Sequence, residues 1–353
     1  MLFTKNAFDY NTITRKKKSH QNNVKKLLPI VQKPQKSFKN ARTRNVFDQK
    51  IRHFRKKFVS LHQFFTPSYS KKKTKNMNKT KILFINTEVM PYLPEDRMPS
   101  IGRRLPHGIQ DAGHEIRTFM PRFGQINERR NQLHEVIRLS GMNLIINDTD
   151  HPLIIKVASI QQARMQVYFI DNDEYFTHRN KYGNAHGEYS DNAERCVFFA
   201  RGVIETIRKL RWKPDVVYCQ GWFSAIAPIY IKKTFAEDPC FRGVKIVFAM
   251  FDNGFQGNLS SNFYRTVKRE GVLKADLIEV KDKPVDYVTM CKLAVKFSDG
   301  LIITDNTPAA EEVKAYAESR GIHILDATDE DLDIDKYDKF FELYNTNPVE
   351  EDD

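Results

Sequence analysis

The sequence has few of the residues that build metal sites, disulfide frameworks and membrane spans. Its 353 residues include only four cysteines, at positions 196, 219, 240 and 291, and no two of them form a C-x-x-C pair. This spacing disfavours a zinc site or a disulfide framework and favours buried, reduced thiols in a cytoplasmic protein. No apolar run reaches about 18 residues and no signal peptide opens the chain, so we expect no membrane span.

The common nucleotide-binding and hydrolase motifs are absent as well. The sequence has no G-x-x-x-x-G-K-[ST] phosphate loop, no G-x-G-x-x-G turn and no G-x-S-x-G nucleophile elbow. The segment HEVIR at 134–138 lacks the second histidine of a zinc-binding helix. Generic motifs therefore predict no metal and no cofactor, and they leave the catalytic residues unknown.

Charge is distributed unevenly along the chain. Residues 1–76 contain 21 Lys and Arg but only two acids, Asp9 and Asp48, whereas the remaining residues contain 36 bases and 42 acids. Such a basic leader opposes compaction, so we expect little fold in it. Three interpretations stay open: an arm for nucleic acid or anionic lipid, an organelle transit peptide, or translated sequence upstream of a true start at Met77.

Strand-like and helix-like segments alternate after residue 77. The apolar runs predict strands at 81–86, 115–121, 153–160, 165–171, 215–219, 244–251, 300–304 and 322–325. Helical spacing predicts helices at 100–113, 191–211, 223–235, 285–298 and 308–319. This alternation predicts a Rossmann-like, doubly wound α/β fold with a mostly parallel sheet. Ligands should bind beyond the carboxyl ends of its strands.

We divide the chain into a basic leader at 1–76, an α/β domain at 77–325 and an acidic tail at 326–353. The tail carries the run DATDEDLDIDKYD, and we expect it to be a solvated segment with a helix near 337–344. A calcium loop is not expected there, because the glycine-containing spacing of such loops is missing.

Six segments in order resemble the N-terminal lobe of the glycogen and starch synthases, which are retaining glucosyltransferases with the two-lobed GT-B architecture. The segments are KILFINTEVMP (81–91), GHEIRTFMPRFG (113–124), VYFIDNDEYF (167–176), SDNAERCVFFARGVIE (190–205), WKPDVVYCQGWFSAIAPIYIK (212–232) and KIVFAMFDNGFQG (245–257). The resemblance implies one Rossmann-like lobe of a GT-B fold. It also implies a role in α-1,4-glucan metabolism, with NDP-glucose as the donor and an α-glucan as the acceptor.

The departures from the family pattern fall on its reactive motifs. The family's K-T-G-G-L phosphate loop is replaced by Pro94–Met98, in which Arg97 is the one cation. The family's H-D-W-H is replaced by Gln220–Phe223, and its H-N pair by Phe251 and Asp252. The C-terminal lobe that carries most donor contacts in the family is not expected within this sequence, so a separate chain would have to supply it.

The positions that match the family, together with Gln220, are our candidates for sugar or acceptor binding. They are Glu88, Asp191, Asn192, Gln220, Trp222, Gln256 and Gly257, with Arg97 at the donor-loop position. Asp191 has a second interpretation as the N-cap of the helix that follows it. Trp222 has a second interpretation as an anchor of the core.

Three functions from different classes remain open at this point. The first is a glycogen/starch synthase-like glucosyltransferase domain that is inactive alone or needs a second lobe. The second is a non-catalytic glucan-binding or regulatory module. The third is nucleic-acid binding through residues 1–76, which requires that this leader be translated.

Overall fold

The computed structural model describes residues 79–329 and 331–345. All the described residues belong to one unit of the chain, Asn76–Asp353. The expectations for the basic leader therefore lie outside the described residues, as do those for the end of the acidic tail. No helix among the described residues is long and apolar enough to cross a membrane.

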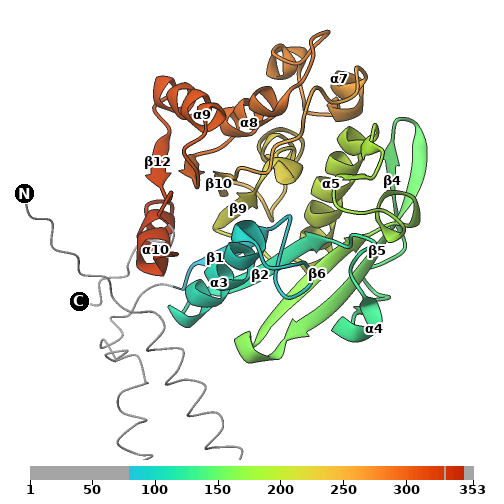
Figure 1. Ribbon diagram of the computed structural model, residues 1–353, viewed down its shortest axis with the longest axis vertical. Coiled ribbons are helices and arrows are strands. Elements are labelled where there is room, and N and C mark those ends of the chain that lie inside the picture. The colour runs from blue at the N-terminus through green and yellow to red at the C-terminus, as the bar shows by residue number, and fades with distance from the viewer. Residues whose placement is uncertain (1–78, 330, 346–353) are drawn as a thin grey trace, which may run out of the picture. The chain divides into compact units, whose positions relative to one another are not determined.

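A ten-stranded sheet forms the centre of this unit (Figure 1). Its strands are β1 (Lys81–Ile85), β2 (Glu115–Pro121), β3 (His134–Glu135), β4 (Met142–Ile146), β5 (Thr149–Ile160), β6 (Met165–Asp171), β9 (Val216–Gln220), β10 (Lys245–Met250), β11 (Gly300–Ile303) and β12 (His323–Asp326). A separate two-stranded sheet consists of β7 (Gly183–Asn184) and β8 (Gly187–Glu188). The α-helices are α3 (Arg97–Asp111), α4 (Glu128–Asn131), α5 (Asn192–Leu210), α6 (Ala227–Ile229), α7 (Phe263–Val267), α8 (Tyr287–Lys296), α9 (Pro308–Ser319) and α10 (Ile334–Glu342).

The strand order is β12-β11-β10-β9-β1-β2-β6-β5-β3, and β4 pairs with β5. The strands from β12 to β6 are parallel, whereas β5 runs antiparallel to β6. Parallel strands are buried on both faces, which explains why they appear in the sequence as continuous apolar runs. The predicted Rossmann-like, mostly parallel α/β fold is confirmed.

Alternate residues of each strand pack on opposite layers of helices. In β1, Leu83 and Ile85 belong to the core beneath α5, α6, α8 and α9, whereas Ile82 and Phe84 belong to the core beneath α3 and α10. The same alternation continues in β9 and β10. This period of two follows from the pleat of the strand.

The structure differs from the sequence prediction in one predicted helix and in one hairpin that was not predicted. The helix expected at 223–235 is broken into a 3₁₀ turn at Trp222–Ser224, the short α6 and a π turn at Tyr230–Thr234. Pro228, within the first turn of α6, has no backbone N–H, so one helix cannot run through this position with all its hydrogen bonds. The hairpin of β4 and β5 was not predicted, although Asn147 and Asp148 both adopt the positive φ of a tight hairpin turn.

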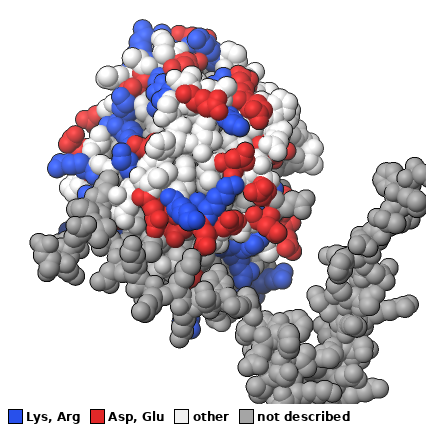
Figure 2. Space-filling model, turned by 90° about the vertical axis from the view of Figure 1, so that its left-hand side faces the viewer, with Lys and Arg blue, Asp and Glu red and all other residues white. Residues whose placement is uncertain are grey.

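The acidic segment after β12 is not simply a solvated tail. It forms α10, whose Tyr337, Phe340 and Phe341 are buried against Phe84 and Tyr218 in the core that α3 also covers. Asp335, Lys339 and Glu342 of this helix are exposed, whereas Asp338 is part-buried and pairs with the buried His114 (2.9 Å). Figure 2 shows acids and bases interspersed on the side of the molecule that carries β12 and α10. The domain boundary at 325 stays a sequence prediction, but the fold continues past it.

If α10 is part of the core, truncating a buried side chain there should lower the free energy of unfolding much more than truncating an exposed one. Phe341→Ala removes a ring that is 1% exposed. We expect the free energy of unfolding to fall by about 3–5 kcal/mol, as for other buried aromatic residues. Leu343→Ala, at a position that is 62% exposed, serves as the control and should change it by less than about 0.5 kcal/mol. Urea denaturation measures both, and equal effects would contradict this assignment of the core.

Candidate functional site

The strand order reverses direction beside β1, which has β2 on one side and β9 on the other. At such a switch point the loops after the two central strands diverge and leave a crevice in which α/β proteins bind ligands. Here the two loops begin at Asn86, after β1, and at Gly221, after β9. The sequence places most of the candidate residues around this point.

Gln220 closes the crevice at the switch point. Its side-chain oxygen accepts hydrogen bonds from the backbone N–H groups of Thr87 (3.1 Å) and Glu88 (3.2 Å). Its side-chain nitrogen donates to the carbonyl of Met98 in the first turn of α3 (3.1 Å). Gln220 is fully buried, so its amide is committed to the protein and faces no solvent.

Backbone geometry brings the turn after β9 close to α3. Gly221 has φ of 69°, and a Cβ atom at this position would lie 2.6 Å from the terminal methyl of Met98. The positive φ favours glycine here, because other residues adopt it only with strain, whereas the Met98 methyl is the movable end of a side chain. The turn and the start of α3 are therefore packed against each other where a ligand crevice would open.

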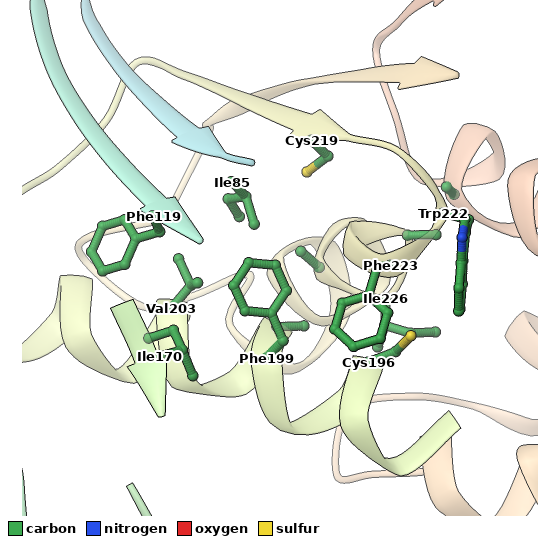
Figure 3. Close-up of a cluster of buried hydrophobic side chains, with 14 of the residues drawn as sticks. Ile85, Phe119, Ile170, Cys196, Phe199, Val203, Cys219, Trp222, Phe223 and Ile226 are labelled. Carbon is green, nitrogen blue, oxygen red and sulfur yellow. The ribbon is translucent and has the colours of Figure 1, made fainter. Parts of the chain in front are cut away.

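Trp222 and Phe223 are both fully buried. The Trp222 indole nitrogen donates to the Asn253 carbonyl (3.0 Å), and its ring packs edge-on against Phe255 at a centroid distance of 4.8 Å. Phe223 points into the core between the sheet and α5, where it lies beside Phe199 (Figure 3). Trp222 therefore has the packing of a core anchor, the second interpretation of this residue.

Glu88 is a buried carboxylate at this edge. Its carboxylate pairs with the Lys181 ammonium (2.9 Å) and accepts a hydrogen bond from the Tyr182 hydroxyl (2.9 Å). Burial, followed by the Glu88 charge, raises the pKa of Tyr182 well above its ordinary value, so this hydroxyl keeps its proton and acts as a donor. The Glu88 carboxylate, 3% exposed, is thus largely satisfied within the protein.

Asp191 and Asn192 lie at the start of α5. Asp191 occupies the N-cap position, but its side chain makes no capping hydrogen bond and instead binds the Arg179 guanidinium (2.7 Å to each oxygen). Asn192 is buried, donates to the Tyr182 carbonyl (2.8 Å) and accepts from Arg195 (2.7 Å). Only Asp191 of this pair retains access to solvent.

Gln256, Gly257 and Arg97 are exposed. The Gln256 backbone N–H donates to Glu188 (3.0 Å), which leaves the Gln256 side chain on the surface. The Arg97 guanidinium donates to the carbonyls of Ala327 (3.0 Å) and Asp329 (2.9 Å), beyond β12. The structure thus separates the candidates into a buried group at the switch point and an exposed group around it, and their ligand contacts remain predictions.

Arg195 organises this edge but is not among the residues predicted from the sequence. Its fully buried guanidinium donates to the carbonyls of Tyr175 (2.8 Å), Lys181 (2.8 Å) and Asn180 (3.0 Å). Burial lowers its pKa to about 10, so it stays charged at neutral pH. Helical spacing in the sequence could have indicated this role, because Arg195 lies three residues after Asn192 and therefore on the same side of the predicted helix.

These contacts limit the reactions and ligands that the residues at this sheet edge can support. Among the described residues there is no group of three or more His, Cys, Asp or Glu that could hold a metal ion. The polar groups at the switch point hold loops together, and the large side chains beside them are aromatic and buried. The arrangement supports a rigid sheet edge with a polar rim.

Together, the doubly wound parallel sheet and the arrangement of its loops define a Rossmann-like α/β lobe of the type found in sugar-nucleotide glycosyltransferases. The sequence model of the starch synthase catalytic domain matches residues 81–326. This chain therefore belongs to the starch synthase catalytic domain family, of the glycogen/starch synthase type.

Several bacterial glycogen synthases are related to the chain at moderate identity. The protein of Chlorobium limicola is 29% identical over 244 residues, and that of Pelodictyon phaeoclathratiforme is 30% identical over 244 residues. Each alignment covers 69% of this chain and 49% of the relative. The protein of Chlorobium chlorochromatii is 32% identical over 206 residues, which cover 58% of this chain and 42% of that protein. The chain thus spans about half the length of these relatives.

A solved structure shares the fold. The catalytic domain of starch synthase IV from Arabidopsis thaliana, bound to ADP and acarbose, superposes with a TM-score of 0.59 at 15% identity. The superposition covers 70% of this chain and 51% of that one. At this identity the likeness bears on the fold, and it agrees with one lobe of a GT-B architecture.

Removing the Gln220 amide tests how much its hydrogen bonds contribute to stability. Gln220→Ala leaves the N–H groups of Thr87 and Glu88 and the carbonyl of Met98 without their partner. We expect the free energy of unfolding to drop by about 2–5 kcal/mol, because unpaired buried polar groups are costly. Gln256→Ala, at an exposed position, is the matched control and should be nearly neutral. Chemical denaturation measures the free energy of unfolding of both variants. An unchanged value for Gln220→Ala would show that this residue does not close the crevice.

Proposed function

We propose that this chain is a glycogen/starch synthase-like domain of α-1,4-glucan metabolism that does not transfer glucose by itself. The observation that carries the proposal is the closed switch point. The amide of Gln220 is hydrogen-bonded to the loop after β1 and to the first turn of α3, and the side chains of Trp222 and Phe223 are in the core. A sugar nucleotide would have to separate these contacts before reaching the carboxyl ends of β1 and β9.

Charge at the first turn after β1 supports the same proposal. A pyrophosphate binds at a helix N-terminus through free backbone N–H groups and the positive end of the helix dipole. Here Asp96 caps α3 by accepting from the Arg97 N–H (2.7 Å), and Glu95 precedes it. Both carboxylates would repel a diphosphate, and the Arg97 guanidinium is hydrogen-bonded to carbonyls of the segment after β12.

The loss of polar groups at the reacting position argues in the same direction. Phe223 stands where the family has a histidine, and its ring packs among Phe123, Phe199 and Tyr182. Removing one group that stabilises transition-state charge commonly lowers kcat by about 100- to 1,000-fold. Here the phosphate loop and the histidine are both replaced, so transfer by this chain alone should be negligible.

A transfer assay tests the proposal directly. The purified full chain is incubated with ADP-[¹⁴C]glucose or UDP-[¹⁴C]glucose and glycogen, and precipitated label is counted. We expect incorporation equal to the protein-free blank, while the glycogen synthase of Chlorobium limicola is run as the positive control. Cooperative thermal unfolding of the same sample shows that it is folded. Incorporation that rises in proportion to the amount of this chain would overturn the proposal.

The exposed polar rim favours a second candidate function, glucan binding without transfer. The Arg179–Asp191 pair and the Gln256 side chain reach solvent near the carboxyl ends of the strands. Hydroxyl groups of a sugar can both donate to carboxylates and accept from amides and guanidinium groups. Trp222 is unsuitable as a test position, because its truncation would damage the core.

Affinity electrophoresis tests glucan binding. We expect the full chain to migrate more slowly in a native gel that contains glycogen than in one without it, and Gln256→Ala or Asp191→Asn to reduce the retardation. Bovine serum albumin serves as the unretarded standard. Equal mobility of the wild-type chain in both gels would eliminate this function. A separate C-terminal lobe and a nucleic-acid partner of residues 1–76 remain hypotheses that these experiments do not address.

A further inference from the structure

Arg201 is a buried cation that forms no ion pair with a carboxylate in the described part of the chain. It lies on α5, which packs against β4 and α7 (Figure 1). Arg201 is 5% exposed, and its Nη1 donates to the carbonyl of Ile145 in β4. Its Nε is buried without a partner, and its Nη2 makes no hydrogen bond to any described residue. One carbonyl therefore engages only one of the five N–H donors of this guanidinium group.

A second arginine, Arg269, lies within electrostatic range of Arg201. Burial, followed by the positive charge of Arg269, lowers the pKa of Arg201 to about 10. Arg201 still carries its charge at neutral pH, so the two guanidinium groups repel each other. Arg269 is half-buried, and its side chain makes no hydrogen bond or ion pair with the residues that the structure describes. Two neighbouring cations thus lack a bound anion.

The carboxylates that are nearest in sequence do not neutralise this pair. Glu205, one turn after Arg201 in α5, binds the Arg208 guanidinium (2.6 Å). Its charge raises the pKa of Arg201, but less than burial lowers it. Glu270, next to Arg269, has an exposed side chain, so water and salt screen its charge. The surroundings of the two arginines are therefore short of negative charge.

Hydrogen bonds hold the backbone on both sides of Arg269. The Tyr230 hydroxyl donates to the carbonyl of Val267 (3.0 Å), and the Thr234 hydroxyl donates to the carbonyl of Glu270 (2.8 Å). Both hydroxyl groups belong to the π turn at 230–234, so this turn anchors the segment that follows α7. A cation on an anchored backbone loses less conformational freedom when it binds a ligand than one on a mobile loop.

The number of charges distinguishes between classes of anion. A guanidinium group binds carboxylate and phosphate oxygens through its parallel N–H donors. A phosphate group is largely dianionic at neutral pH, because its second pKa is about 6, and its oxygens point in several directions. A carboxylate has one charge and two oxygens in one plane. A tetrahedral dianion can therefore neutralise and bridge two guanidinium groups, whereas one carboxylate cannot do so as well.

We propose that Arg201 and Arg269 form a binding site for a phosphate dianion between α5 and the segment that follows α7. The anion contacts Nη2 of Arg201, which, unlike Nε, is not closed off from solvent. The inference does not rest on the proposed function. No hydrogen bond or ion pair among the described residues joins either arginine to Gln220 or Trp222, so this site is separate from the switch point.

Isothermal titration calorimetry of the full chain with inorganic phosphate, at neutral pH and fixed ionic strength, tests the inference. We expect saturable binding that weakens about tenfold or more in Arg269→Ala, because hydrogen bonds between charged groups are the stronger ones. Arg269→Gln keeps most of the side chain and should show the same loss. Lys268→Ala, which removes the same charge from the adjacent exposed residue, is the matched control and should bind like the wild-type chain.

A second set of ligands identifies the source of the anion. Binding of glycerol phosphate as well as inorganic phosphate supports a site for the phosphate group of a small molecule. Binding of inorganic phosphate alone supports a site for the free ion. Acetate, with one charge, should bind about tenfold more weakly than phosphate or not at all. Cooperative thermal unfolding shows that each variant is folded.

Three outcomes overturn the inference. The first is the absence of saturable phosphate binding by the wild-type chain. The second is equal weakening in Arg269→Ala and Lys268→Ala, which would show diffuse attraction by surface charge. The third is acetate binding as tight as phosphate binding, which would assign the wrong class of anion. None of these results depends on whether the chain transfers glucose, so failure here is distinguishable from failure of the proposed function.

Discussion

The structure of the sheet edge depends on the side-chain amide of Gln220. This one group joins the loop after β1, the end of β9 and the first turn of α3 through both its oxygen and its nitrogen. Each contact is buried, and a buried amide whose oxygen and nitrogen both have partners makes its surroundings rigid, because breaking these bonds leaves a polar atom without water. The position where related folds keep an open crevice is therefore part of the packed interior.

The second constraint comes from Arg195, which is buried without a carboxylate directly bonded to it. Its guanidinium is satisfied by three backbone carbonyls and Asn192, and it lies 5.5 Å from the centroid of the Phe223 ring. Those carbonyls belong to the segment that also supplies Lys181 and Tyr182 to Glu88. Aromatic packing and loop anchoring are thus coupled, and Phe223 stabilises the position that a histidine holds in the family.

Accessible polar surface lies away from the switch point. The switch point is filled by Gln220, Trp222 and Phe223, whereas α10 rests on α3 and leaves a charged pocket beside the first turn of that helix. Burial of Phe340 and Phe341 beneath α10 fixes the distance between the two walls of this pocket.

Local sequence patterns were sufficient for most of the alternating strands and helices, the mostly parallel sheet and the family, but not for β4 or for the break in the helix expected at 223–235. Apolar runs and helical spacing are properties of neighbouring residues, so they are legible without a structure. The role of Gln220 was not predictable, because its partner Thr87 is 133 residues away and a polar residue at a strand end has no local signature. Likewise, only the tertiary structure showed that Arg97 points towards the segment after β12 and that the acidic segment returns to the core as α10. Sequence by itself determined the architecture, and long-range hydrogen bonds and packing decided which of its polar residues remain free to meet a ligand.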